Sequence, residues 1–295
     1  MMLHRETEYN QRSQGTRAKV AEPTVLEHIW PEKLTGPPSF ILTPNTSYCM
    51  ENNYLVVVFT RIDEPFIRER FRSTYGRLAS KYNFTIVFPL GVTNSSAVNA
   101  DVLKEHAKHD DILQADFMDT YYNLTLKSYS YRNYVRQHCM SVRVVLKLDD
   151  DVVWNVDSMI KYLSQIDDGG NMVLHCRSQK RIFVVRNVTS RWYLHPKEYP
   201  YRHFPEYCIS GASAATPQTI AALAEASNTV PYVWIDDVWS LGLVPRKVGA
   251  TFHSMPYGGI KGFFDPFLNG SVIAQDFKRQ EEGLYLFTQV NGKLL

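Results

Sequence analysis

The feature that most constrains this sequence is an apolar run, residues 142–148, that leads directly into Asp149, Asp150 and Asp151. Valine and leucine dominate the run, which predicts a strand buried on both faces of a mostly parallel sheet. Side chains alternate along an extended chain, so we expect Asp149 and Asp151 on one side and Asp150 on the other. Two carboxylates at the C-terminal end of a central strand predict a site for Mg²⁺ or Mn²⁺.

A short acidic run after a strand has a simpler explanation as a solvated loop, which is its commoner fate. Here, however, the buried strand brings three charges to one edge of the sheet. Unpaired carboxylates repel one another there, so the arrangement favours a ligand site.

Strand and helix patterns alternate along the chain. The expected strands cover residues 54–60, 84–90, 110–116, 142–148 and 172–176, and the expected helices 64–76, 99–108, 119–139, 156–166 and 217–227. Such alternation predicts an α/β fold, with a parallel sheet flanked by helices. Residues 1–45 are polar and interrupted by prolines, so we expect a largely unstructured leader or stem there and a single domain over 46–295.

The composition is that of an ordinary globular protein, with 44% hydrophobic residues and a net charge of +2 from 32 basic and 30 acidic residues. We find no block of lysine and arginine of the kind that binds a phosphate backbone, and we therefore expect no nucleic-acid partner. Residues 1–36 hold no apolar run long enough for a signal peptide or a membrane span.

Four cysteines show neither a CxxC pair nor a zinc spacing, so they are expected to be disulfide partners or buried thiols. Three pairings are possible among them. Six Asn-x-Ser/Thr sequons exceed the chance expectation and indicate the secretory pathway. Because no anchor is visible, either the anchor is missing from this sequence or the targeting signal is one that we cannot see. The cysteines are Cys49, Cys139, Cys176 and Cys208, and the sequons begin at Asn45, Asn83, Asn94, Asn123, Asn187 and Asn269.

Six sequence blocks occur in an order and spacing that resemble the β-1,3-galactosyltransferase family, inverting enzymes of the Golgi that use UDP-sugars. The blocks are FRSTYG at 71–76, FPLG at 88–91, DILQADFMDTYYNLTLK at 111–127, VVLKLDDDVVWNVD at 144–157, FPEYCISG at 204–211 and IDDV at 235–238. Any one block is a weak signal, but six in register make a chance match improbable.

The resemblance implies a GT-A (Rossmann-like) glycosyltransferase fold with a mostly parallel central sheet, formed by a catalytic domain over 46–295. It implies Mn²⁺, a UDP-sugar donor, most often UDP-galactose or UDP-N-acetylglucosamine, and a glycan acceptor on a glycoprotein or glycolipid. It also implies a type II protein on the lumenal side of the Golgi membrane, held by an anchor that this sequence does not show.

We expect the metal ligands to be Asp151, Asp149 and His253. Asp151 is the best direct ligand, and Asp149 binds the ribose of the nucleotide or a metal-bound water. A lone histidine is more often a core or surface residue than a ligand. His253, however, resembles the histidine that completes the family's metal site from the C-terminal side.

We expect Asp149, Asp150, Arg72 and Lys147 to bind the donor nucleotide, with Asp150 ordering the local backbone. All four lie within the matched blocks.

The candidate catalytic residues are Asp237 and Asp236, which follow an apolar run at the expected start of a helix. By its match with the family's EDV triplet, Asp237 is expected to act as the general base towards the acceptor hydroxyl. Asp236 is expected to hold the turn or an acceptor hydroxyl. The alternative is that both acids only cap the helix.

Two departures from the family pattern are visible. Tyr75 stands where the family usually has tryptophan, and Asp236-Asp237-Val238 is followed by Trp-Ser-Leu rather than Tyr-Val-Gly. The second acid is retained, so we expect the same chemistry, whereas the changed surroundings leave the identity of the acceptor open.

Two other classes remain as alternatives. Asp149-x-Asp151-x-Val153, Ser210 and the later acidic pair copy the layout of a haloacid-dehalogenase-like phosphatase. That fold, however, opens with its DxD strand, whereas β-α units precede the acids here. The second alternative is a sugar-nucleotide or glycan-binding relative that has lost catalysis.

Overall fold

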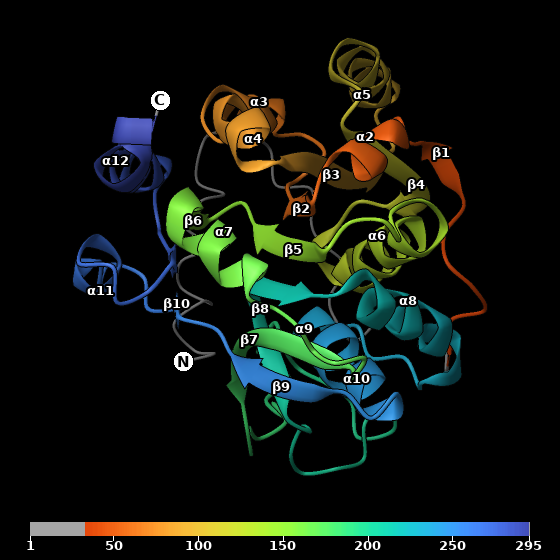
Figure 1. Ribbon diagram of the computed structural model, residues 1–295. Coiled ribbons are helices and arrows are strands. Elements are labelled where there is room, and N and C mark those ends of the chain that lie inside the picture. The colour runs from red at the N-terminus through yellow and green to blue at the C-terminus, as the bar shows by residue number, and fades with distance from the viewer. Residues whose placement is uncertain (1–32, 295) are drawn as a thin grey trace.

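The computed structural model describes residues 33–294, apart from the side chain of Ser210. Residues 1–32 of the expected leader therefore lie outside the described residues. The structure has an eight-stranded sheet, a second sheet of three strands, and helices packed against them (Figure 1). The strands are β1 (Phe40–Leu42), β2 (Tyr54–Phe59), β3 (Phe84–Val92), β4 (Ile112–Met118), β5 (Val144–Asp149), β6 (Val152–Trp154), β7 (Val173–Gln179), β8 (Tyr207–Ala215), β9 (Thr251–Ser254), β10 (Tyr257–Gly258) and β11 (Ala274–Asp276).

The helices occupy the segments between the strands. They are α2 (Ser47–Glu51), α3 (Pro65–Ser73), α4 (Gly76–Tyr82), α5 (Ser96–His109), α6 (Leu124–His138), α7 (Val156–Ser164), α8 (Pro217–Ala226), α9 (Asp236–Val238), α10 (Val244–Lys247), α11 (Asp265–Leu268) and α12 (Gln280–Asn291). A π-helical turn, Trp239–Leu243, connects α9 to α10.

The large sheet has the strand order β1-β4-β3-β2-β5-β8-β7-β9. Strands β4, β3, β2 and β5 are mutually parallel, and β8 runs antiparallel to both of its neighbours. In chain order the four parallel strands follow the 3-2-1-4 arrangement of doubly wound nucleotide-binding folds. This confirms the α/β class. The central sheet as a whole is mixed, and its parallel part consists of these four strands and the β7–β9 pair.

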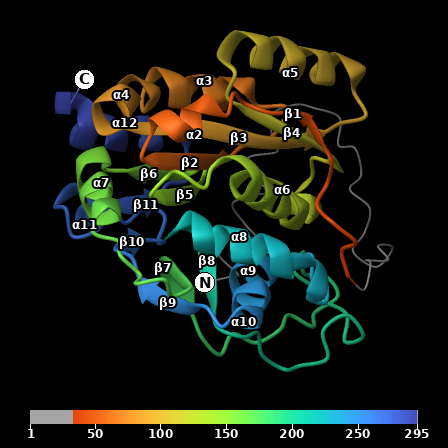
Figure 2. The ribbon, with the colours of Figure 1, turned by 45° about the vertical axis from the view of Figure 1, so that its right-hand side comes forward.

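Both faces of the sheet are buried, because alternate residues of β2 enter different cores. Leu55 and Val57 pack with α6 and α8, whereas Val56 and Val58 pack with α3, α4, α7 and α12. Figure 2 shows α3 and α4 on one side of the sheet and α6 and α8 on the other. The continuous apolar runs of the parallel strands are the consequence of this double coverage.

Gly76 begins α4, although we expected it to end a single helix over residues 64–76. The helix breaks earlier, at Thr74, where the backbone leaves the helical region. Tyr75 then lies in the hinge between the two helices, and its ring stacks on Trp154 with the ring centroids 4.8 Å apart. The packing of Tyr75 explains the break, which helical spacing alone does not reveal.

Residues 33–45 are the described part of the segment 1–45 that we expected to be largely unstructured, and they include a strand. Residues 40–42 form β1, which pairs with β4 at the edge of the large sheet. The Asp116 N–H donates to the Ser39 carbonyl, and the Phe40 ring packs edge-on against Tyr134. Backbone pairing at an otherwise open sheet edge therefore orders this short stretch.

All four cysteines form disulfides, so none is a buried thiol. The structure also shows which of the three possible pairings occurs. Cys49–Cys139 connects α2 to the end of α6, and Cys176–Cys208 connects β7 to β8. Within residues 33–294 the structure contains no helix long and apolar enough to cross a membrane.

We expect the Cys49–Cys139 bridge to contribute more stability than Cys176–Cys208. The two bridges join residues 90 and 32 positions apart. In the chain-entropy description these loops correspond to about 4–5 and about 4 kcal/mol. Denaturant titrations of C49S/C139S and C176S/C208S would measure the difference in stability. If non-reducing peptide mapping found another pairing of the cysteines, the prediction would be contradicted.

Candidate active site

The three aspartates lie where β5 ends. Asp149 is the last residue of β5 and lies opposite Phe59, the last residue of β2. The Asp150 N–H donates to the Phe59 carbonyl at 3.1 Å, and the Phe277 N–H donates to the Asp151 carbonyl at 2.9 Å. Strand alternation therefore extends only to Asp149, and Asp150 and Asp151 belong to the turn before β6. The turn is held from two directions by main-chain hydrogen bonds.

Lys147 connects this turn to the second acidic pair. It is 3% exposed, and its ammonium group lies 2.5 Å from Asp149 Oδ1 and 4.3 Å from the centroid of the Phe59 ring. Burial alone would lower the pKa of Lys147, but Asp149, Asp236 and Asp237 outweigh it and raise the pKa. The lysine is therefore charged and lies among acids from β5 and α9.

Asp236 and Asp237 begin α9, and they differ in burial. Asp236 is 7% exposed, and Asp237 is half-buried. Burial raises the pKa of Asp236 to about 6, although Lys147 and Ser240 oppose the shift. Ser240 Oγ also donates to the Asp236 carbonyl at 2.8 Å. The pair thus combines a sequestered acid with a more accessible one.

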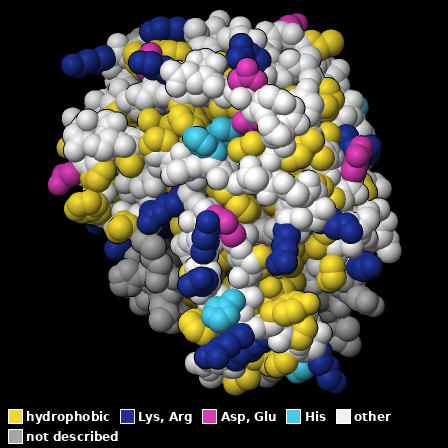
Figure 3. Space-filling model, turned by 60° about the horizontal axis from the view of Figure 1, so that its bottom comes forward, with side chains coloured by type: hydrophobic (Ala, Val, Ile, Leu, Met, Phe, Trp, Pro, Cys, Tyr) yellow, Lys and Arg dark blue, Asp and Glu magenta, His cyan; other side chains and the backbone are white. Residues whose placement is uncertain are grey.

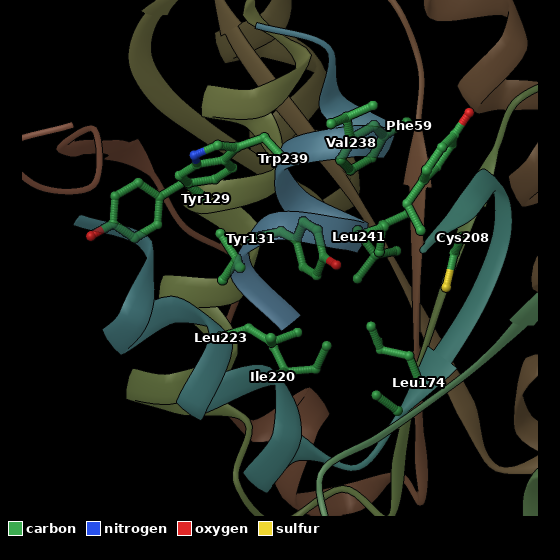
Figure 4. Close-up of a cluster of buried hydrophobic side chains, with 14 of the residues drawn as sticks. Phe59, Tyr129, Tyr131, Leu174, Cys208, Ile220, Leu223, Val238, Trp239 and Leu241 are labelled. Carbon is green, nitrogen blue, oxygen red and sulfur yellow. The ribbon is translucent and has the colours of Figure 1, made fainter. Parts of the chain in front are cut away.

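Core packing fixes the position of this acidic pair. Trp239, two residues beyond Asp237, is completely buried. Figure 4 shows its indole together with Val238 and Leu241 in the core that side chains of α6 and α8 also line. The half-buried carboxylate is therefore presented by a rigid segment, as catalytic geometry requires.

Asp276 is a fourth acid near the aspartate turn, and we did not predict it. Strand β11 pairs antiparallel with β6, which places Asp276 opposite Val152. Asp276 is 1% exposed and accepts a hydrogen bond from the Tyr257 hydroxyl. A sequence signal existed, because residues 272–274 form a third apolar run that ends near an acid.

Gly211 provides the space for this arrangement. A Cβ at Gly211 would collide with the Tyr257 hydroxyl and lie 3.0 Å from Asp276 Oδ1. The small residues of the block at 208–215 thus accommodate two side chains from other strands, and this close approach is the feature that their composition indicates.

His253 does not lie with the aspartates, which corrects the expected ligand set. It is exposed on β9, in register with His175 of β7, which is in turn opposite Ala214 of β8 and Leu146 of β5. Three strand spacings of about 4.8 Å place it roughly 14 Å from β5. Sequence order gives no measure of this sideways separation.

Arg72 is also not at the aspartate turn. Its guanidinium group forms ion pairs of 2.7 Å with Glu105 and with Asp111, the residue before β4, and β3 and β2 lie between β4 and β5 in the sheet. Arg70 lies at the turn instead, and its Nη2 is 3.4 Å from the Asp150 carbonyl. Two residues along a helix differ by about 200° in direction, so one of these arginines faces the turn and the other faces away.

Asp149 and Asp151 supply hard carboxylate oxygens, whose chemistry fits Mn²⁺ or Mg²⁺. Among residues 33–294 no three His, Cys, Asp or Glu side chains form a group that could hold a metal ion alone. Such ions are commonly bound by one or two carboxylates together with the phosphates of a substrate. The donor set therefore fits an ion that arrives with a diphosphate.

The aromatic-rich segment of residues 191–207 packs beside the acidic pair of α9. Trp192 Nε1 donates to the Tyr121 hydroxyl at 3.0 Å, and Tyr121 packs edge-on against Trp234, two residues before Asp236. The Arg191 guanidinium group lies 3.9 Å from the centroid of the Tyr121 ring.

Figure 3 shows lysine, arginine and hydrophobic side chains interspersed on the lower face of the molecule.

Comparison with known proteins finds a matching family model and similar enzymes. A family model described as Galactosyltransferase matches residues 67–256. Human beta-1,3-galactosyltransferase 5 is 28% identical over 248 residues, which are 81% of this chain and 79% of the relative. Lactosylceramide 1,3-N-acetyl-beta-D-glucosaminyltransferase of Xenopus tropicalis is 27% identical over 253 residues, which are 81% of this chain and 67% of the relative.

We expect Asp236→Asn to stabilise the protein at neutral and alkaline pH. When folding raises the pKa of an aspartate, the protein loses stability as pH rises through the pKa of the folded state, which is about 6 for Asp236. Its ordinary value is 3.8, so the variant should gain up to about 3 kcal/mol above pH 6 and almost nothing below pH 4. Denaturant titrations at pH 4 and pH 8 measure this difference.

Asp101→Asn, on the exposed face of α5, is the control and should change stability by less than about 0.5 kcal/mol at both pH values. If Asp236→Asn were less stable than wild type at pH 8, attraction between Asp236 and Lys147 would outweigh burial, contrary to this expectation.

Proposed function

This chain belongs to the galactosyltransferase family and is a hexosyltransferase, and on that basis we propose that it transfers galactose or N-acetylglucosamine from a UDP-sugar to a glycan in β-1,3 linkage. The supporting observation is the placement of two acidic groups on separate elements around the buried ammonium of Lys147. One group suits a donor diphosphate, and the other suits an acceptor hydroxyl.

On the donor side, Asp151 and Asp149 would hold Mn²⁺. When bound, the ion supplies positive charge against the diphosphate leaving group. Lys147 forms an ion pair with Asp149, and Arg70 approaches the backbone of Asp150. We assign no ligand role to His253, and Asp276 is placed to support the turn from β11.

On the acceptor side, Asp237 is the proposed general base. The acceptor oxygen bonds to the anomeric carbon while the bond from that carbon to the diphosphate breaks, and the hydroxyl proton passes to Asp237. Attack on the face opposite the leaving group inverts the configuration. Asp236 is too buried to meet an acceptor directly and instead positions α9 through its contact with Ser240.

The phosphatase alternative is not supported, because the matched family is a transferase family and three parallel strands precede β5 in the chain. A catalytically inactive relative remains the second candidate, since Trp239 follows the acidic triplet. The buried indole, however, packs into the core, so this change leaves Asp237 accessible.

We propose the lumenal side of the Golgi membrane as the location. Two disulfides suit an oxidising compartment. Five of the six sequon asparagines are exposed, namely Asn45, Asn83, Asn94, Asn187 and Asn269. Asn123 is half-buried and donates to the Met118 carbonyl, so it is a poorer acceptor for a glycan than the other five.

We expect Asp237→Asn to abolish transfer while donor binding persists. Removal of the proton acceptor should lower kcat by about 10²-fold or more, with UDP affinity near wild type. The assay uses UDP-galactose and UDP-N-acetylglucosamine with Mn²⁺ and an acceptor panel. A parallel reaction with a generic phosphatase substrate should show no turnover.

Asp236→Asn is the matched control, because it makes the same replacement of a carboxylate by an amide at the neighbouring position. If Asp237→Asn retained the wild-type rate and Asp236→Asn were inactive, the two roles would be exchanged. If both variants remained active, the proposed base would be wrong.

We also expect Mn²⁺ and UDP to bind with mutual dependence, because two carboxylates leave most of the coordination shell for phosphate and water. Calorimetry should show that EDTA or Asp151→Ala weakens UDP binding by about tenfold or more. Asp150→Asn should have a smaller effect than Asp151→Asn. UDP affinity that is indifferent to EDTA would refute the proposed metal site.

A further inference from the structure

Residues 258–262 form a short segment, here called the Lys261 strap, that lies against the aspartate turn. It begins in β10, which pairs with β11, and the Gln275 side chain donates to the Ile260 carbonyl at 2.9 Å. A Cβ at Gly258 would collide with the side chain of Gln275, and Gly262 has a φ of +80°. Glycine is therefore needed at both ends of the strap, and the path between them is set by β11.

Lys261 extends from this strap to Asp151. Its Nζ lies 2.5 Å from Asp151 Oδ2, and the side chains of Lys261 and Asp151 are only 14% and 22% exposed. The two residues are 110 positions apart, so the contact is tertiary rather than local. An ammonium group thus contacts one oxygen of the carboxylate that we propose as the principal metal ligand.

We propose that Lys261 is a tethered cation that neutralises Asp151 in the donor-free enzyme and moves to the diphosphate of the donor when a divalent ion takes its place. This inference rests on the proposed donor site. Two positive charges at contact distance repel each other strongly in a partly buried site, and a divalent ion repels the ammonium group twice as strongly as a monovalent ion. Lys261 and the ion therefore cannot both remain at Asp151.

The diphosphate gives the displaced ammonium a new partner within the same site. Lysine binds phosphate as a point charge, and its flexible four-carbon side chain lets the ammonium group move while the backbone of the strap stays in place. Lys261 and the strap lie beyond residues 67–256, so the family match assigns this lysine no role. Lys147 cannot make the same exchange, because both neighbours of β5 hold its backbone.

The test compares Lys261→Met with Lys278→Met. Lys278 is an exposed neighbour whose Cε lies 4.0 Å from the position of a Cβ on Gly262, so its variant removes the same charge beside the strap. Mn²⁺ binding is measured without nucleotide by electron paramagnetic resonance, and UDP binding is measured calorimetrically at saturating Mn²⁺. We expect Lys261→Met to tighten Mn²⁺ binding about tenfold and weaken UDP binding about tenfold, and Lys278→Met to change neither.

Asp151→Asn separates failure of this inference from failure of the donor site. If Asp151→Asn binds Mn²⁺ like wild type, the donor site itself is wrong. If Asp151→Asn loses Mn²⁺ while Lys261→Met binds Mn²⁺ and UDP like wild type, only the role of Lys261 is overturned. Should Lys261→Met not fold, Lys261→Arg replaces it and is expected to keep UDP affinity within about twofold, because the charge is retained. A larger loss in that variant would overturn the proposal.

Discussion

The site depends on one buried cation, Lys147. A lysine in a strand that is covered on both faces must find negative partners, because an unpaired ammonium in the interior is costly. Asp149 meets this need from the same strand, and Asp236 and Asp237 meet it from α9. The requirement therefore connects two acidic segments that are far apart in the sequence. It also keeps like charges close together, which would otherwise repel one another.

The topology of the sheet makes this connection possible. Strand β8 is inserted antiparallel beside β5, and the chain returns through α8 before it begins α9. Burial of Trp239 then fixes α9 against the core, so the half-buried Asp237 is held by packing rather than by a loop. The cost is a buried Asp236 with a raised pKa, which is an instance of stability lost at a functional site.

Sequence patterns predicted the features of single segments but not which segments lie side by side in the sheet. The apolar run before Asp149 sufficed to predict a buried strand ending in acids, because two-sided burial leaves that pattern. Sequence patterns could not show that His253 lies three strands away from β5, since no single segment determines the order of strands across a sheet. Arg72 was preferred to Arg70 by its place in a matched block, although the faces of α3 are decided by contacts with Glu105 and with the turn.

The two lysines of the site differ in how firmly their backbones are held, and this decides where a change in charge can occur. Lys147 belongs to a strand paired on both sides, so its ammonium is a permanent part of the scaffold. Lys261 is carried by a glycine-bounded segment held by one short strand pair and the Gln275 side chain. A donor that brings both a divalent cation and two phosphates changes the charge around Asp151, the carboxylate that Lys261 contacts. The strap can therefore respond to donor binding while the core of the site, around Lys147 and α9, stays fixed.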